Sequence, residues 1–302
     1  MKDVVVLSQI DENEFINNYI VPNKPVILTA EMENWSLERF QPKDLQSEIG
    51  EHIVHVYDDL FNLVNLCPLK DYLKKNFFKS PGEDRSREYV RAYVKLADVD
   101  FEWANELFSK LSGAWHYPSC FPGNSMLVPY CSATDNIDPT VCDFPYKGLF
   151  VSGRGARTRL HRDPFNSNAI LCQIYGKKKF LLYHPSKASL VMNGEDFVDP
   201  TDIDIKLFPE FQSISPDFEI ELKAGECIFL PKGWFHDVTS MTDSISITWN
   251  FIHSSELGEF CRHVENNPSE QELEKLKYFW RDFISSDSSA DEIVKVAKSL
   301  VF

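Results

Sequence analysis

Short runs of β-branched and aromatic residues, separated by Gly, Pro, Asn and Asp, dominate the chain from about residue 145 to residue 252. Such runs predict strands, and the residues between them predict turns. The expected strands cover 148–152, 169–175, 178–183, 219–222, 227–230 and 244–252. Because no helical period interrupts these runs for long, the pattern favours a β-sandwich or barrel over a parallel βαβ sheet.

The segment before this β region reads as an α+β lead-in over residues 1–85. Polar residues from Asp11 to Glu14 precede apolar side chains at helical spacing, and Pro22 ends that run. The other expected elements are a strand over 25–29, a helix over 69–78, a polar connection over 79–85 and a strand over 88–96.

After residue 253 the apolar period becomes that of a helix. Apolar side chains fall at i, i+3, i+7 and i+10, at Leu273, Leu276, Trp280 and Phe283. We therefore expect a helical tail over 253–302, with a further helix over 290–302. An exposed stripe of this size would be a liability, so we expect it to pack on the β core or on a second subunit, which would make a homodimer.

Composition and charge narrow the class of protein. The chain has 302 residues and a formal net charge of −15, with 43% hydrophobic residues, which is enough for a core. Such an acidic chain repels a phosphate backbone, so the charge disfavours nucleic acid and favours a basic or neutral partner. We find neither an apolar run of ~18 residues nor a signal-peptide pattern, and expect no membrane segment and an intracellular protein, cytoplasmic or nuclear.

The first candidate for chemistry is the pair His161 and Asp163. Residues i and i+2 of a strand project from the same face, so the imidazole and the carboxylate could reach one metal ion. The pattern alone is weak, because about one such pair is expected by chance in this composition. A second pair, His263 and Glu265, lies in the expected helical tail, where i and i+2 diverge by about 200°.

His236 supplies a third ligand. It ends the run Gly225-Glu-Cys-Ile-Phe-Leu-Pro-Lys-Gly-Trp-Phe-His236, which reads as a turn, a strand and a second turn. Two histidines and one carboxylate form the facial triad of non-haem Fe(II) enzymes, which leaves coordination positions open for oxygen and a co-substrate. Taken by itself, His236 is better explained as a half-buried histidine at an aromatic corner.

Four ordered blocks give these residues a context. They are Thr158-Arg-Leu-His161-Arg-Asp163, Gln173–Ser186 with Lys177-Lys178-Lys179, Ala224–His236, and Ser246-Ile-Thr248-Trp-Asn250-Phe. Together they resemble the JmjC family of Fe(II)- and 2-oxoglutarate-dependent oxygenases, within the cupin superfamily. The resemblance implies a mainly β fold with a double-stranded β-helix (jelly-roll) core, iron at His161, Asp163 and His236, and O2 as the oxidant. On this basis residues 86–252 are the catalytic core, 1–85 the lead-in packed on it, and 253–302 the helical segment.

The resemblance also implies which residues contact 2-oxoglutarate. Lys178, 17 residues after His161, matches the family's cation for the distal carboxylate. Thr248 and Asn250 belong to a polar row that would face the pocket, although a solvent face is the usual reading of such a row. Thr158 also matches a family position, but strict alternation puts it on the wrong face, so its role requires a bulge. Tyr89 resembles a tyrosine that holds the same ligand, and core packing explains it equally well.

Two features depart from the family pattern or stand outside it. Asn166 and Asn168 are offset from the position where several family hydroxylases carry an Asn, and Leu171 occupies one expected place, so substrate-positioning details do not transfer. A local basic cluster, Arg154, Arg157, Arg159 and Arg162, reads either as solvated strand-edge charge or as a guide for anionic 2-oxoglutarate.

The leading hypothesis is an Fe(II)- and 2-oxoglutarate-dependent dioxygenase that hydroxylates an amino-acid side chain of a protein or peptide and releases succinate and CO2. N-methyl-lysine demethylation passes through the same hydroxylation step, so the core motif does not separate the two. A non-catalytic cupin binding module would usually lack a triad member. A cupin isomerase or thiol-type dioxygenase would not need Lys178.

Overall fold

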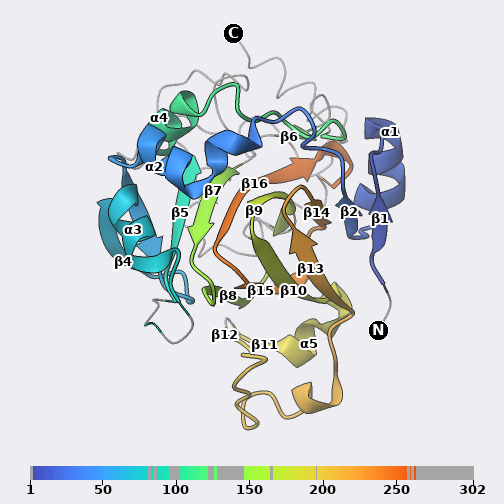
Figure 1. Ribbon diagram of the computed structural model, residues 1–302. Coiled ribbons are helices and arrows are strands. Elements are labelled where there is room, and N and C mark those ends of the chain that lie inside the picture. Colours follow the sequence, from blue (N-terminus) through green and yellow to red (C-terminus); the bar gives the residue numbers. More distant parts are fainter. Residues whose placement is uncertain are drawn as a thin grey trace, which may run out of the picture.

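The computed structural model of the chain describes residues 3–80, 83, 87–94, 103–121, 126–127, 146–163, 166–194, 196–256, 259 and 262. Two mainly antiparallel sheets face each other and form its centre (Figure 1). The smaller sheet has four strands in the order β13 (Phe218–Lys223), β10 (Lys177–Tyr183), β15 (Phe235–Ser240) and β8 (Arg157–His161). The mainly β, jelly-roll fold expected from the sequence is therefore confirmed.

The larger sheet has ten strands and includes strands from the lead-in. Its order is β1 (Val5–Leu7), β2 (Val26–Leu28), β14 (Cys227–Leu230), β9 (Asn168–Tyr175), β16 (Ser244–His253), β7 (Tyr146–Ser152), β5 (Tyr89–Val94), β3 (Ile53–Tyr57) and β4 (Leu63–Pro68), while β6 (Met126–Leu127) pairs with β16. β1 and β2 are parallel, and β2 adds antiparallel to β14. The lead-in thus extends the sheet of the β core at both ends.

Helices between residues 12 and 110 cover the outer side of the larger sheet (Figure 1). They are α1 (Glu12–Phe15) with a π-helical turn over Ile16–Ile20, a 3-10 turn over Leu37–Phe40, α2 (Pro42–Ile49), α3 (Leu69–Asn76) and α4 (Trp103–Lys110). Asp11 caps α1, because its carboxylate accepts a hydrogen bond from Glu14 N at 2.9 Å. The expected helices beginning near residues 12 and 69 are both confirmed.

Two apolar layers flank the larger sheet. The outer layer includes Phe15, Phe40 and Trp249, which pack between the sheet and the helices. The inner layer lies between the two sheets and includes Phe180 and Leu182 of β10. Because side chains alternate along β10, its even-numbered residues point inward. Lys178 is one of them, and it is only 5% exposed.

The segment between β10 and β13 forms a separate lobe, for which the sequence patterns gave no elements. It contains a 3-10 turn over Pro185–Lys187, α5 (Ala188–Val191), β11 (Met192–Asn193), β12 (Asp196–Phe197) and a 3-10 turn over Phe211–Ser213, and it projects from the smaller sheet at the bottom of Figure 1. Its own apolar cluster includes Val191 and Phe208, and Leu160 of β8 anchors it to the sheet.

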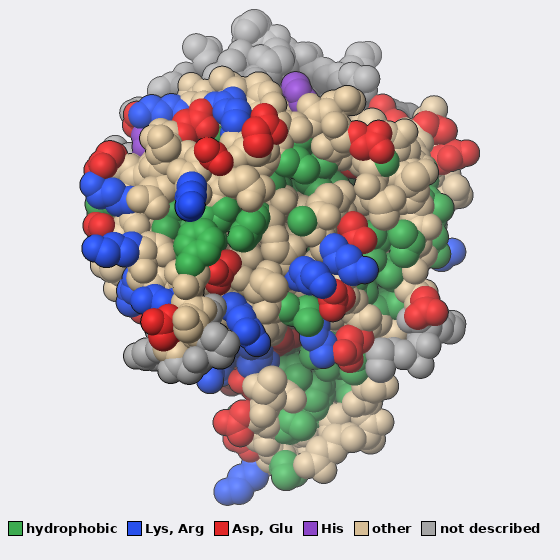
Figure 2. Space-filling view, viewed as in Figure 1, with side chains coloured by type: hydrophobic (Ala, Val, Ile, Leu, Met, Phe, Trp, Pro, Cys, Tyr) green, Lys and Arg blue, Asp and Glu red, His purple; other side chains and the backbone are tan. Residues whose placement is uncertain are grey.

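The end of the chain lies largely outside the described residues. After a 3-10 turn over Ser254–Glu256, only residues 259 and 262 are described, so the expected tail helices and the homodimer stay predictions. Within the described part, every helix is too short or too polar to span a bilayer. Acidic and basic side chains are interspersed over the face shown in Figure 2, with apolar side chains between them.

Candidate functional site

His161 and His236 lie side by side on neighbouring strands of the smaller sheet. They are directly paired residues of β8 and β15, and their ring centroids lie 4.1 Å apart. Each ring donates its Nδ1–H to the backbone carbonyl two residues earlier, His161 to Arg159 O at 2.8 Å and His236 to Trp234 O at 3.1 Å. A carbonyl can only accept, so both Nε2 atoms carry lone pairs that are available to a metal ion.

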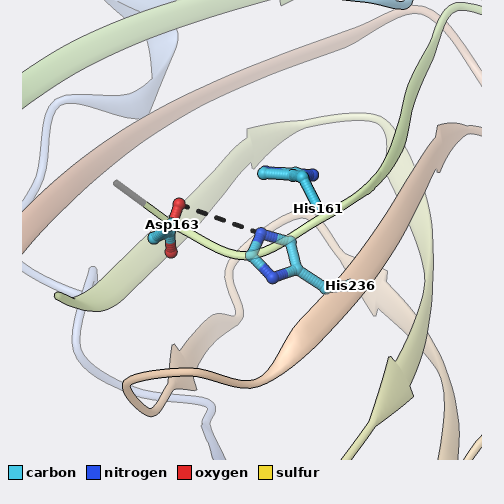
Figure 3. Close-up of side chains that lie close together, drawn as sticks. All are labelled: His161, Asp163 and His236. Atoms are coloured by element: carbon cyan, nitrogen blue, oxygen red, sulfur yellow. Dashed lines mark ion pairs between the residues drawn. The ribbon is translucent and has the colours of Figure 1, made fainter. Parts of the chain in front are cut away.

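Asp163 completes the cluster (Figure 3). Its Oδ1 lies 3.9 Å from His236 Nε2, and one ligand atom from each of the three residues falls within 4.8 Å of the others. The expectation that His161 and Asp163 share a strand is wrong, because β8 ends at His161. Pro164 follows Asp163 in the sequence and has no N–H for a sheet, and the carboxylate reaches the cluster from the segment after the strand.

The protonation state of His161 suits a metal ligand. Burial, and then the nearby His236, lower the pKa of His161 well below its usual value, so its ring is neutral near pH 7. Two imidazoles and one carboxylate are the donor set of non-haem Fe(II) centres. The residues present therefore fit the iron that the sequence implied.

A β-bulge explains how Thr158 and His161 reach the same cavity. His236 pairs with His161 and Val238 pairs with Thr158, so Arg159 and Leu160 together face only Asp237. The extra residue in β8 reverses its alternation, and both Thr158 and His161 line the pocket. The bulge that the role of Thr158 required is thus present.

The cluster opens into a cavity between the two sheets that encloses about 510 Å³ of space, part of it open to solvent. The sequence-predicted residues that line it are Thr158, His161, Asp163, Lys178, His236, Thr248 and Asn250. Tyr89 lines a smaller cavity behind it, which shares Thr158 and Lys178 with the first. All the predicted site residues therefore surround one connected region of the fold.

Lys178 is the buried cation of this region. Its Nζ donates to Ser246 Oγ at 2.7 Å and lies 5.4 Å from the centre of the Phe150 ring. Burial lowers its pKa to about 7. No carboxylate in the described part of the chain forms an ion pair with it, whereas Lys177 and Lys179 pair with Glu221 and Glu219 outside the barrel. An anionic ligand would supply the charge that this ammonium lacks.

The other predicted contacts are buried polar groups. Thr248 and Asn250 are 5% and 2% exposed, which excludes the solvent-face reading of the polar row on β16. Thr248 Oγ1 donates to Ile170 O at 3.2 Å, and Asn250 Nδ2 donates to Ser167 Oγ at 3.3 Å. The hydroxyl of Tyr89 is buried, no described residue gives it a hydrogen bond of ordinary length, and burial raises its pKa.

Among the pocket-lining residues that sequence reasoning missed, Phe61 and Arg91 lie beside the His161 ring. The Phe61 ring meets the His161 ring edge-on at 4.9 Å, and the Arg91 guanidinium lies 5.2 Å from the Phe61 ring centre. Arg91 follows Tyr89 by two residues on β5, so strand alternation could have placed it on the inner face. Phe61 lies in the β3–β4 turn at a φ of 64°, and nothing in its sequence context indicates the site.

Two members of the basic cluster form ion pairs that stabilise the strands, and one of them, Arg157, also lines the smaller cavity. Arg157 donates through Nε and a terminal nitrogen to Asp237 and also pairs with Asp199 at 2.8 Å. Arg159 pairs with Asp59 at 2.8 Å. Since the Arg157 side chain is only 12% exposed, it is a structural ion-pair residue and not solvated edge charge.

A jelly roll in which two histidines and an aspartate converge on an internal cavity defines a metal-binding cupin. The chain belongs to the family of cupin-like domains, which matches residues 12–257. It is 24% identical over 291 residues to the 2-oxoglutarate and iron-dependent oxygenase JMJD4 of Danio rerio, covering 91% of this chain and 65% of the relative. The corresponding protein of Homo sapiens is 24% identical over 282 residues, covering 89% of this chain and 65% of the relative.

A plant relative carries a different activity in its name. The arginine-specific demethylase JMJ22 of Arabidopsis thaliana is 27% identical over 274 residues, covering 87% of this chain and 49% of the relative. These matches confirm the resemblance to the JmjC family. The chain spans less than two thirds of the length of each of these relatives.

Proposed function

We propose that the chain is an Fe(II)- and 2-oxoglutarate-dependent dioxygenase that hydroxylates an amino-acid side chain of a protein or peptide. The observation that carries this proposal is one cavity with His161, Asp163 and His236 on one wall and the buried ammonium of Lys178 on another. A metal-binding cupin without 2-oxoglutarate has no need of that cation. The names of the JMJD4 relatives support the same cofactor and co-substrate.

Iron and 2-oxoglutarate, when bound, supply the oxidising chemistry: O2 and 2-oxoglutarate are consumed, succinate and CO2 are released, and one oxygen atom enters a substrate C–H bond. The chain's own residues would hold and orient these groups. His161 and His236 would bind iron through Nε2, since their Nδ1 atoms are committed to backbone carbonyls. Asp163 would add the charged ligand and leave the remaining positions open.

Lys178 would hold the distal carboxylate of 2-oxoglutarate. Its ammonium, the Thr158 hydroxyl and the buried Tyr89 hydroxyl line the smaller cavity together. Hydroxyl donors beside a buried ammonium are the groups that a carboxylate requires when it leaves water. Thr248 and Asn250 line the cavity from β16 and would contact the rest of the co-substrate.

Phe61 and Arg91 would lie on the substrate side of the iron. Phe61 covers one edge of the His161 ring, and the half-buried Arg91 lies over Phe61. An apolar wall beside the ligands excludes water from the reacting position. These two residues are therefore the first to vary when substrate selectivity is tested.

The proposal is tested by incubating the protein with Fe(II), 2-oxoglutarate, O2 and a peptide library or cell lysate, followed by mass spectrometry. A gain of 16 Da on a side chain, accompanied by succinate and abolished by His236→Ala, is the expected result. Succinate and modified peptides both absent, with iron bound, would favour a non-catalytic binding module, although all three ligands are present.

Demethylation is the second candidate, because two Arabidopsis thaliana relatives are named arginine-specific demethylases. Hydroxylation of an N-methyl group gives an unstable product that loses formaldehyde, so the same site would perform both reactions. The name points to methyl-arginine, whereas our sequence-based alternative was methyl-lysine. A loss of 14 Da from methylated peptides, without a gain of 16 Da elsewhere, would decide for this candidate.

The proposal includes an intracellular location, cytoplasmic or nuclear. The described cysteines Cys67, Cys120, Cys172 and Cys227 are all free, which fits a reducing compartment. Reduced iron is also most readily maintained there. Fluorescence microscopy of the tagged protein tests this point independently of the activity.

A further inference from the structure

A buried polar network joins the two chain segments that carry the proposed ligands. Asn168, at the start of β9, is completely buried and lies five residues after Asp163. Its side-chain Oδ1 accepts a hydrogen bond from the backbone N–H of Lys232 at 2.9 Å. Lys232 lies in the turn between β14 and β15, four residues before His236. One amide group therefore connects the Asp163 segment directly to the His236 turn.

The other end of the same amide is anchored to the end of β16. Asn168 Nδ2 donates to Glu256 Oε2 at 2.5 Å, and the same oxygen accepts from His253 N at 3.1 Å. Lys232 Nζ lies 3.4 Å from Glu256 Oε1. Glu256 is only 4% exposed, so these donors offset the cost of burying its carboxylate. Asn168 cannot turn without leaving buried groups unpaired.

The two ligand segments also approach each other closely at Gly233. A Cβ atom there would lie 3.0 Å from Asn166 Oδ1, and the residue adopts a φ of 71°. Only glycine tolerates both conditions without strain. The contact between the segments thus involves the Asn166 side chain against Gly233 and the hydrogen bond of the Asn168 amide to Lys232.

We propose that Asn168 is a positioning residue that sets the placement of His236 relative to Asp163. It lines neither cavity and is not one of the ligands, so it would act through the Lys232–His236 turn. This inference rests on the proposed iron site and gives a role to an asparagine that is offset from the family pattern. Residues that orient metal ligands from outside the ligand set typically contribute 10- to 100-fold, roughly, to metal affinity.

The test uses Asn168→Ala, with Asn76→Ala as the matched control. Asn76 is also completely buried, lies at the end of α3, and donates through its side chain to Tyr72 O at 3.1 Å, away from the pocket. Anaerobic titration of the metal-free proteins with Fe(II), well below their unfolding temperatures, measures the dissociation constant. We expect Asn168→Ala to raise it roughly 10- to 100-fold and Asn76→Ala to leave it unchanged, although both lower thermal stability.

Hydrogen exchange and a second Asn168 variant complete the test. Hydrogen exchange of the metal-free protein should show lost protection over residues 231–236 in Asn168→Ala and not in Asn76→Ala. If Asn168→Ala does not fold, Asn168→Ser keeps one neutral hydrogen-bonding group at this position and should weaken iron binding by a smaller factor. Equal Fe(II) constants for wild type and the Asn168 variants would overturn the positioning role, whereas a wild type that binds no Fe(II) would instead overturn the iron site.

Discussion

His161 and His236 are directly paired on neighbouring antiparallel strands, and each donates its Nδ1–H to the carbonyl oxygen two residues before it. The same hydrogen bond to the carbonyl oxygen two residues earlier thus fixes the tautomer of both rings. The pairing brings together residues 75 positions apart in the chain, as the register of β8 and β15 requires. This relationship makes the ligand positions a property of the sheet, so changes at the ligands should affect metal binding much more than folding.

The first prediction concerns the ligands themselves. His161→Ala and His236→Ala should each abolish Fe(II) binding and succinate formation, because each removes a ligand that no other residue described in the structure replaces. Far-UV circular dichroism should remain that of the wild type. His116→Ala, at an exposed histidine, serves as the control. Full turnover by either ligand variant would show that the metal, if any, lies elsewhere.

The second prediction separates co-substrate binding from metal binding. Lys178→Ala leaves the distal carboxylate buried without its partner, a loss of ~2–5 kcal/mol. At ~1.4 kcal/mol per decade, the apparent 2-oxoglutarate constant should rise roughly 30-fold or more, with little change in Fe(II) affinity. Lys177→Ala and Lys179→Ala are matched controls, since these neighbours are 47% and 41% exposed. The same small effect from all three substitutions would remove Lys178 from the co-substrate site.

The third prediction follows from the lowered pKa of Lys178. Burial places it at about 7, so without an anion the ammonium is protonated below that pH and neutral above it. A dicarboxylate binds the protonated form. The 2-oxoglutarate dissociation constant should therefore be nearly flat below about pH 6 and rise toward tenfold per pH unit above about pH 7. Calorimetric titration across pH should show this rise in the wild type and a flatter profile in Lys178→Met.

The fourth prediction concerns stability. Arg157→Met leaves Asp237 buried without its partner, and breaking such a pair typically costs about 3–5 kcal/mol. Urea unfolding of the metal-free protein measures this loss. Arg154→Ala, on an exposed neighbour, should stay within about 0.5 kcal/mol of the wild type. A loss below about 1 kcal/mol for Arg157→Met would mean that water reaches Asp237.

The sequence predicted the strands and the ligands better than the connections between them. Runs of β-branched and aromatic residues bounded by turn residues located β9, β10, β14 and β16. Alternation set the Lys178 side chain opposite to those of both neighbours, and the family pattern singled it out for the pocket. The sequence showed only that a bulge in β8 was needed if Thr158 was to face the pocket. Its position could not be predicted, since bulges depend on the partner strand.

Contacts between segments far apart in the chain could not be predicted from local sequence patterns. Phe61 reaches His161 from a turn 100 residues earlier, and Arg157 finds Asp237 across the smaller sheet. Neither pairing follows from propensity or spacing. Asn168 was noticed only as a departure from a family pattern, and its bonds to Lys232 and Glu256 depend on how three chain segments meet.

The most direct test of the account is anaerobic visible spectroscopy of the protein with Fe(II) and 2-oxoglutarate. Chelation of a 2-oxo acid by protein-bound Fe(II) gives a weak charge-transfer band. We predict that the band appears only when both are present, is absent in His236→Ala, and requires a higher 2-oxoglutarate concentration in Lys178→Ala. A wild type that binds Fe(II) but never develops the band, at saturating 2-oxoglutarate, would contradict the assignment.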